Sequence, residues 1–215
     1  MILPWGYDPR NPRPATYAAP VTSLPRPGLP GRAEVSVRPA RAADDEAIAR
    51  VQLVTWATAY RGLLPAAVLD DWDAVAAADA WRRAVTAPPT PEHGLLVALD
   101  GEVVVGYAAF GPAEPGSDEE PTPGGPTVEV DALLVEPRWG RRGHGSRLLA
   151  AVVDVVSARG VVGLRIWLPE DDTVTARFLG GAGWAPDGWT RTLDAGTSLI
   201  RQLRWHTTLD DEDGQ

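Results

Sequence analysis

Hydrophobic and polar residues alternate with a period of two between residues 128 and 134, which predicts a half-buried β-strand. Pro137 ends this strand, because proline has no N–H group to donate to a neighbouring strand. The hydrophobic positions of the strand are Val128, Val130, Ala132 and Leu134. From residue 148 the period becomes helical, with a hydrophobic face made of Leu148, Leu149, Val152, Val153 and Val156. The two patterns predict a strand, a turn and a helix in direct succession.

The other elements follow from the same two periods and from the turn residues between them. Asp100-Gly101 lies between two apolar runs and indicates a hairpin over 95–110. Further strands are expected at 35–39, 161–168, 184–193 and 198–209, and further helices at 42–60, in two pieces within 63–85, and at 172–179. The order β-α-α-β-β-β-α-β-α-β-β predicts an α+β fold, a mixed, mostly antiparallel sheet with helices on both faces. One right-handed crossover is expected at 127–168.

The chain divides into a Pro-rich N-terminal arm at 1–34, one domain at 35–209 and an acidic tail at 210–215. Eight of the first thirty residues are Pro, and a segment of this composition cannot build a hydrophobic core. We expect the arm either to be flexible or draped over the surface, or to dock on a second copy in a homodimer. The aromatic residues available for such docking are Trp5, Tyr7 and Tyr17.

Composition excludes several classes of function. The net charge of −9 and pI of about 4.8 disfavour binding to nucleic acid or to an acidic membrane. All 20 basic residues are Arg and there is no Cys, which excludes lysine Schiff bases, thiol nucleophiles and Cys-ligated metals. The three His residues lie far apart, so no metal site is expected. The chain shows neither a membrane span nor a signal peptide, and we expect a cytoplasmic protein.

The turn between the predicted strand and helix contains Gly140, Gly143 and Gly145. The first N–H groups of a helix have no partner within the helix, so this turn is a ready anion site, and Arg141 and Arg142 add positive charge to it. A nucleotide P-loop is excluded because it requires Lys. The dinucleotide fingerprint is excluded because, started at Gly143, it would need glycine at position 148.

Around this turn the chain reads Leu133-x-Val135-x-Pro137-x-x-x-Arg141-Arg142-Gly143-His144-Gly145-Ser146-x-Leu148-Leu149. The run resembles the acetyl-coenzyme A loop of the GNAT N-acetyltransferases, Gln/Arg-x-x-Gly-x-Gly/Ala, with Gly140 in the first position. The run from Asp172 to Phe178, Leu179 and Trp184 resembles the family segment Asn-x-x-Ala-x-x-Phe-Tyr…Gly-Phe. Upstream, Val37-Arg38-Pro39 and the run 56–65 resemble the first strand and the acceptor-side helices. The resemblance covers about residues 35–208 in matching order.

The resemblance implies that acetyl-CoA is the co-substrate and that two strands splay apart to admit its pantetheine arm. That arm would pair with the backbone of Leu133, Leu134 and Val135. The pyrophosphate would bind the turn, formed by Arg141, Arg142, Gly143, His144, Gly145 and Ser146. Phe178 and Asp172 would contribute further contacts from the next helix. For Asp172 the alternative role is simply to cap that helix.

The resemblance also implies direct attack of a primary amine on the thioester, which requires a base for the ammonium proton. Glu129 matches the position of the base in histone-type members, and Asp131 is the second candidate. The alternative for Glu129 is a polar residue on the exposed face of a half-buried strand. A backbone N–H near Leu134 or Val135 would stabilise the oxyanion.

Leu179 stands where the family usually has a Tyr that protonates the leaving thiolate. That proton would come instead from water, Tyr107 or His206, or the thiolate would leave without an acid. Trp56 and Tyr60 would line the acceptor side, or else are core aromatics. The expected acceptor is an amine of a small molecule or peptide. The alternative to an enzyme is a non-catalytic acyl-CoA-binding or regulatory module, because Gly140 and Leu179 depart from the family pattern.

Overall fold

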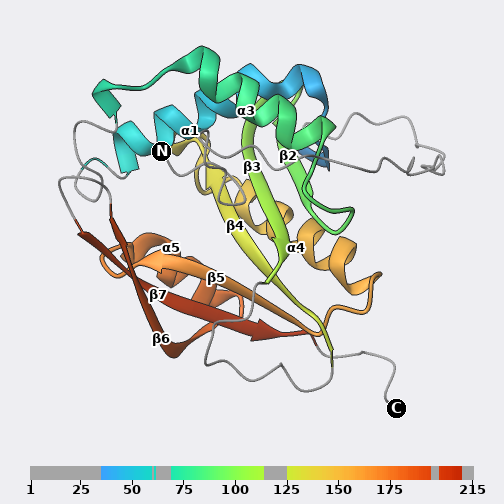
Figure 1. Cartoon of the computed structure of the whole chain (residues 1–215), viewed down its shortest axis with the longest axis vertical. Helices are drawn as coiled ribbons and strands as arrows, with labels where there is room; N and C mark the ends of the chain where they lie inside the picture. The colour runs from blue at the N-terminus through green and yellow to red at the C-terminus, as the bar shows by residue number, and fades with distance from the viewer. Residues whose placement is uncertain (1–34, 60, 62–68, 114–124, 195–198, 210–215) are drawn as a thin grey trace.

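The computed structural model describes residues 35–59, 61, 69–113, 125–194 and 199–209. Within these residues seven strands form one sheet in the order β1-β2-β3-β4-β5-β7-β6 (Figure 1). Their bounds are β1 Val35–Pro39, β2 Gly94–Asp100, β3 Val103–Pro112, β4 Thr127–Val135, β5 Gly163–Pro169, β6 Ala185–Asp194 and β7 Leu199–Thr208. All neighbouring strands are antiparallel except β4 and β5, which are parallel. The predicted α+β fold and the order of its elements are confirmed.

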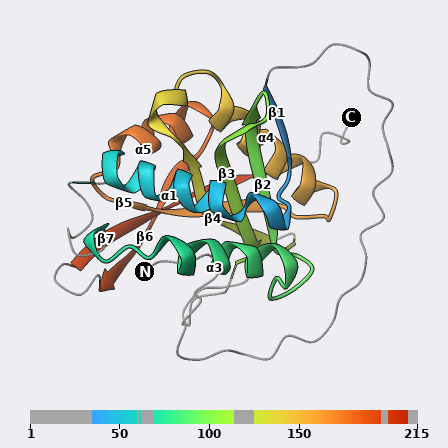
Figure 2. The ribbon, with the colours of Figure 1, turned by 90° about the horizontal axis from the view of Figure 1, so that it is seen from above.

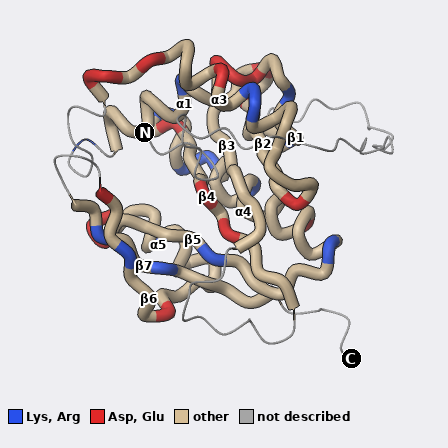
Figure 3. Tube along the Cα trace, in the orientation of Figure 1, with Lys and Arg blue, Asp and Glu red and all other residues tan. Residues whose placement is uncertain are grey.

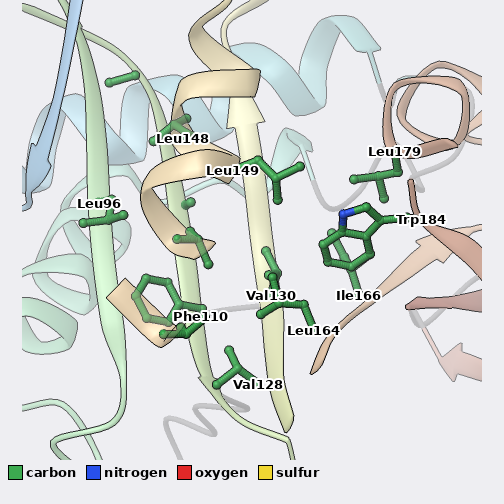
Figure 4. Close-up of a cluster of buried hydrophobic side chains, with 14 of the residues drawn as sticks. Leu96, Phe110, Val128, Val130, Leu148, Leu149, Leu164, Ile166, Leu179 and Trp184 are labelled. Carbon is green, nitrogen blue, oxygen red and sulfur yellow. The ribbon is translucent and has the colours of Figure 1, made fainter. Parts of the chain in front are cut away.

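The helices cover the two faces of the sheet in pairs (Figures 1 and 2). Their bounds are η2 Ala42–Asp44, α1 Asp45–Ala59, α3 Ala74–Thr86, η3 Pro137–Trp139, α4 His144–Ser157 and α5 Thr173–Gly181. One core lies between the sheet and α1 and α3, and contains Ile48, Trp56, Trp81, Val97, Tyr107 and Leu134. The other lies between the sheet and α4 and α5, and contains Leu96, Phe110, Val130, Leu148, Leu164 and Leu179 (Figure 4).

Side-chain hydrogen bonds fix the start of two helices. The Asp73 carboxylate accepts a hydrogen bond from the N–H of Ala76 at 2.9 Å, and Asp172 accepts one from the N–H of Thr175 at 3.0 Å. The helix expected at 42–60 begins instead with a 3₁₀ turn, η2, whose Asp44 binds Arg38 through both carboxylate oxygens. The helix expected from about residue 148 begins at His144 instead. Gly143, the residue before it, has a left-handed backbone and forms the N-cap of α4.

β4 contains a β-bulge that the alternation in the sequence did not predict. Ala109 of β3 faces Ala132 and Phe110 faces Val130, so Asp131 has no partner residue on β3. The bulge reverses the faces of the strand. Val128 and Val130 belong to the core under α4, whereas Ala132 and Leu134 pack on the core under α1 and α3. The prediction that these four residues share one face was therefore wrong.

β4 and β5 pair only at their beginnings. Thr127, Val128 and Glu129 face Gly163, Leu164 and Arg165, and beyond these residues β5 keeps only its pairing with β7, which runs along its other edge from residue 163 to residue 169. The two strands diverge in Figure 1, as the family resemblance implied. We call the divergence of residues 130–135 of β4 from β5 the β4–β5 fork. The β4 edge that faces β5 has no strand partner along this fork, so its backbone groups can pair with a ligand.

Several predictions concern residues outside the described part of the chain. They include the arm at 1–34 with its aromatic residues, the tail at 210–215, the start of the helical pieces within 63–85, and Tyr60. The division of the chain and the docking of the arm on a second copy therefore stay predictions. Among the described residues, no helix is both long enough and apolar enough to cross a membrane.

Candidate active site

The turn between η3 and α4 and the first residues of α4 form the predicted anion site, and we call residues 140–146 the anion loop. The N–H groups of residues 141–146 have no hydrogen-bond acceptor within the described part of the chain. Arg141 has a φ of 60°, an uncommon left-handed backbone for a residue other than Gly, and Gly143 has a φ of 80°. These two residues turn the chain so that consecutive N–H groups precede the first turn of α4. Such a set of donors at a helix N-terminus suits a phosphate dianion.

Two glycines of the anion loop have separate structural reasons. Gly143 has the left-handed φ, and a Cβ atom there would lie 2.6 Å from Nη1 of Arg147. Gly145 is the first glycine of α4, and its Cβ position faces the ring of Phe178 at 3.6 Å and the side chain of Val135 at 3.9 Å. The absence of a side chain at Gly145 leaves space between the loop, α5 and the end of β4.

The side chains of the loop do not all point the same way. Arg142 stacks on Trp139, with its guanidinium carbon 4.8 Å from the ring centroid, and the backbone oxygen of Arg142 accepts a hydrogen bond from Arg147 at 3.1 Å. His144 is buried, its Nε2 lies 3.6 Å from Asp100 at the end of β2, and burial lowers its pKa. The imidazole of His144 therefore faces the protein interior, and only its backbone N–H remains for an anion.

Glu136 anchors the start of the loop to the rest of the domain. Its side chain is buried and forms ion pairs with Arg50 of α1 and with Arg138. Arg50 also donates a hydrogen bond to the backbone oxygen of Val104 on β3 at 2.7 Å. Only the Glu136 carboxylate is buried, since 38% of the Arg50 side chain and 64% of the Arg138 side chain are exposed, and the two arginines supply the positive charge that this buried carboxylate needs.

The residues predicted to bind pantetheine lie along the fork. Leu133 and Val135 pack against the core under α4, while Leu134 is buried in the other core. Phe178 reaches toward Gly145 from α5. Asp172 uses both carboxylate oxygens to cap α5, accepting from the N–H of Thr175 at 3.0 Å and from its hydroxyl at 2.7 Å. This geometry supports the capping role for Asp172, and its contact with pantetheine stays a prediction.

Glu129 and Asp131 lie where β4 leaves β5, but in different environments. Glu129 accepts a hydrogen bond from Nε of Arg165 at 2.8 Å and lies 3.8 Å from Nη1 of Arg191. Asp131, at the bulge, has no ion pair among the described residues. Burial, followed by the negative charge of Glu129, raises the pKa of Asp131 to about 7. Asp131 is nevertheless exposed by its accessible surface, so solvent screening reduces this shift without changing its direction.

The face of β5, β6 and β7 opposite α5 carries aromatic and cationic side chains that the sequence analysis missed. On β5, Arg165 and Trp167 alternate with Leu164 and Ile166 of the core, so they point to that opposite face. The aromatic and cationic residues of this face include Trp167, Trp189, Arg191 and Arg204. Figure 3 shows basic residues gathered along these strands. The period of two in β5 was the sequence signal that could have predicted this second face.

The aromatic residues proposed for the acceptor side divide. Trp56 is buried in the core and packs edge-on against Trp72, with ring centroids 5.5 Å apart, and its role on the acceptor side stays a prediction. Tyr60 lies outside the described residues.

The two side chains proposed as the acid lie in different surroundings. Tyr107 is buried against Trp81, and Leu179, which stands in place of the usual Tyr, is fully buried in the core. His206 is exposed on β7, opposite Arg165. Of Tyr107 and His206, only His206 is exposed, and the identity of the acid stays a prediction.

The fold is that of solved acetyltransferases. The structure of yncA, a putative acetyltransferase from Salmonella typhimurium with its cofactor acetyl-CoA, matches with a TM-score of 0.60 at 18% identity, covering 84% of this chain and 96% of that chain. The PaiA N-acetyltransferase of Thermoplasma acidophilum in complex with coenzyme A matches with a TM-score of 0.61 at 13% identity, covering 81% and 99%. At these identities the likeness is one of fold.

Residues 53–180 match the model of the acetyltransferase (GNAT) family, and the chain belongs to that family. Among curated relatives, the mycothiol acetyltransferase of Rhodococcus erythropolis is 41% identical over 86 residues, which are 40% of this chain and 23% of that protein. The mycothiol acetyltransferase of Kineococcus radiotolerans is 35% identical over 167 residues, or 72% and 48%. The chain thus spans less than half the length of these two relatives.

Proposed function

We propose that this chain transfers an acetyl group from acetyl-CoA directly to a primary amine of a small molecule or peptide. The observation that carries the proposal is the conjunction of the β4–β5 fork with the anion loop at its end. An unpaired strand edge suits the amide groups of pantetheine, and unpaired N–H groups at a helix N-terminus suit a pyrophosphate. Solved relatives of the same fold contain acetyl-CoA or coenzyme A.

In this proposal the cofactor runs from the anion loop along the fork toward Asp131. Its pyrophosphate accepts hydrogen bonds from the N–H groups of residues 141–146, with Arg142 adding positive charge. Its pantetheine passes Gly145, where no side chain projects from the loop, and pairs with the free edge of β4. The thioester then lies beside the second half of β4, where an N–H of Leu134 or Val135 donates to the oxyanion.

Asp131 is the better candidate for the base. The amine attacks the thioester carbon, its ammonium proton passes to a carboxylate directly or through water, and the C–S bond breaks to release the coenzyme A thiolate. A base works best when its pKa lies near the operating pH, as that of Asp131 does. Glu129 instead accepts a hydrogen bond from Nε of Arg165 at 2.8 Å, so its carboxylate is already engaged with a side chain of β5. Its role is then to hold Arg165 and to raise the pKa of Asp131.

Two measurements test this function. Isothermal titration should detect acetyl-CoA binding to the full chain, and a thiol-release assay should detect coenzyme A formed only in the presence of an amine. A panel of amino acids, polyamines, aminoglycosides and peptides, with the acceptor of mycothiol acetyltransferases included, samples the acceptor classes. Failure to bind acetyl-CoA at millimolar concentration contradicts the proposal. Binding without turnover of any amine supports the second candidate, a non-catalytic acyl-CoA-binding module.

A further inference from the structure

The charges on the face of the sheet opposite α4 and α5 are nearly all paired with one another. Arg165 binds Glu129 at 2.8 Å, and Arg204 binds Asp187 at 2.6 Å. Of the charged groups around the fork, this leaves Asp131 without an ion pair in the described part of the chain. Arg191 makes only a long ion pair, with its Nη1 atom 3.8 Å from Oε1 of Glu129, and this separation is beyond hydrogen-bond distance. One carboxyl group without an ion pair and one weakly paired guanidinium therefore lie at the fork.

Other contacts hold Arg191 in place, while its terminal nitrogens make only the long ion pair with Glu129. Its Nε donates a hydrogen bond to Oε1 of Gln202 at 2.7 Å, and its guanidinium carbon lies 4.5 Å from the centroid of Trp167. These two contacts fix the plane of the guanidinium. Its Nη atoms make no hydrogen bond to a described residue, and 41% of the side chain is exposed. A fixed, accessible guanidinium fork matches the two oxygens of a carboxylate.

Asp131 lies within electrostatic range of this guanidinium. The charges that act on the Asp131 carboxyl are those of Glu129, Arg191 and Arg165, and Arg191 in turn senses Glu129 and Asp131. Asp131 is also the bulged residue at the start of the fork, next to the strand edge proposed to hold the thioester. The available carboxyl group is thus beside the reacting bond, and the available guanidinium is beside the carboxyl group.

We propose that the acceptor is a small amine that also carries a carboxylate, such as a free amino acid, with its ammonium at Asp131 and its carboxylate on Arg191. This inference rests on the proposed function. An acceptor that carries an ammonium group but no carboxylate would be repelled by Arg191, because both groups are positively charged. The carboxylate takes no part in the bond changes: the amine nitrogen forms the amide bond, the C–S bond breaks, and the ammonium proton leaves through Asp131. Binding the carboxylate fixes the amine in position for attack.

The test compares free α-amino acids with their carboxamides, which keep the amine and side chain but lack the anion. The wild-type chain should acetylate the acid with a kcat/KM about tenfold or more above that of the amide, because a site built for a charged partner rejects the analogue that lacks it. The ammonium of the amide is the more acidic of the two, so intrinsic amine reactivity favours the amide. A preference for the acid therefore reports recognition of the carboxylate.

Variants locate that recognition. Arg191→Met should lower the acid-to-amide ratio of kcat/KM to about one, and Arg191→Lys should restore part of it, since an ammonium keeps the charge without the planar fork. Arg201→Met is the matched control, because Arg201 is an exposed β7 residue whose side chain pairs with Glu170 instead. It should leave the ratio unchanged.

Two results overturn the inference without touching the proposed function: acetyl-CoA binding with equal use of acid and amide, or acetylation confined to amines without a carboxylate. A wild-type preference for the acid that persists in Arg191→Met also rejects Arg191 as its cause. Absence of acetyl-CoA binding would reject the proposed function itself.

Discussion

The two halves of the sheet are built differently. In the half made of β1 to β4, helices cover both faces, and five consecutive residues of β2, Leu95 to Leu99, are buried. In the half made of β5 to β7, α5 covers one face, and most residues of β6 are exposed. The core under α1 and α3 lies wholly in the first half, and β5 and α5 of the second half contribute Leu164, Ile166 and Leu179 to the other core. The opposite face of the second half presents charged and aromatic side chains. The first half is therefore packed on both faces, whereas the second is packed on one face only.

The border between the halves is the β4–β5 fork. β4 belongs to the covered half through its pairing with β3, and its other edge is free from residue 130 onward. Asp131 lies on this border, and its pKa is raised. In the covered half, a charged carboxylate would need a paired partner, because an unpaired buried charge is costly. The comparison teaches that the pairing of β4 changes along its length, so one strand serves both stability and function.

The largest expected effect is on catalysis at the border. Asp131→Asn should lower kcat/KM by about 10²–10⁴-fold, the usual contribution of a general base. In the wild type kcat/KM should rise as pH rises through about 7, because the base must lose its proton, and this limb should vanish in the variant. Acetyl-CoA affinity, measured by titration, should be unchanged.

A stability control accompanies this variant. The folded pKa of Asp131 lies above its unfolded value, so the ionised group costs stability increasingly as pH rises from about 4 to about 7. Asp131→Asn should therefore be at least as stable as the wild type at pH 8 in thermal unfolding. Full activity of Asp131→Asn would remove Asp131 from the mechanism and return the role to Glu129.

The next effect contrasts a Trp in each half. Trp81 is fully buried and donates a hydrogen bond to Gln52 at 2.8 Å, so Trp81→Ala should cost about 3–5 kcal/mol in the free energy of unfolding. Trp189 is 40% exposed, and Trp189→Ala should cost less than about 1 kcal/mol. Chemical denaturation of both variants measures the difference. Equal losses would contradict the division between the halves.

A smaller effect is expected at the end of the fork. A Val side chain at residue 145 would fill the space toward Phe178 and Val135, where pantetheine is proposed to pass. Gly145→Val should weaken acetyl-CoA binding by about 10- to 100-fold, an overpacking cost of about 1–3 kcal/mol. Thermal unfolding of the free protein should change little. Unaltered affinity would move the cofactor away from this space.

The smallest effect concerns charge at the anion loop. Arg142 is exposed and stacked on Trp139, so Arg142→Ala should weaken acetyl-CoA binding only about 2- to 5-fold. The difference between variant and wild type should shrink as salt is raised, because salt screens exposed charges. Titration at two ionic strengths measures this, with Arg201→Ala as the control. A difference that salt does not alter would mean that Arg142 acts through packing on Trp139.

Local patterns in the sequence predicted the elements and their order, because each pattern depends on its own residues. The fork and the position of β7 between β5 and β6 depend on which strands pair, which no local period encodes. The bulge escaped detection because Val128, Val130, Ala132 and Leu134 alternate without a break, whereas the extra residue shows only against the register of β3.

The site was predicted unevenly for similar reasons. The glycines of the anion loop carry a spacing that a single segment can display, and the loop geometry agrees with it. The buried imidazole of His144 lies beside Asp100, which is forty-four residues earlier in the chain, so the sequence of the loop alone does not predict its burial. The environment of Asp131 depends on Arg165 and Arg191, which three different strands bring together.

Backbone hydrogen exchange with and without saturating coenzyme A tests most directly the claim that the β4–β5 fork and the anion loop form one cofactor site. We expect slower exchange in two segments, 130–135 of β4 and 141–146 of the anion loop, because their N–H groups gain acceptors. The segments 35–39 and 94–100 should not change. Protection confined to residues outside 130–146, with these two segments unaltered, would contradict the account.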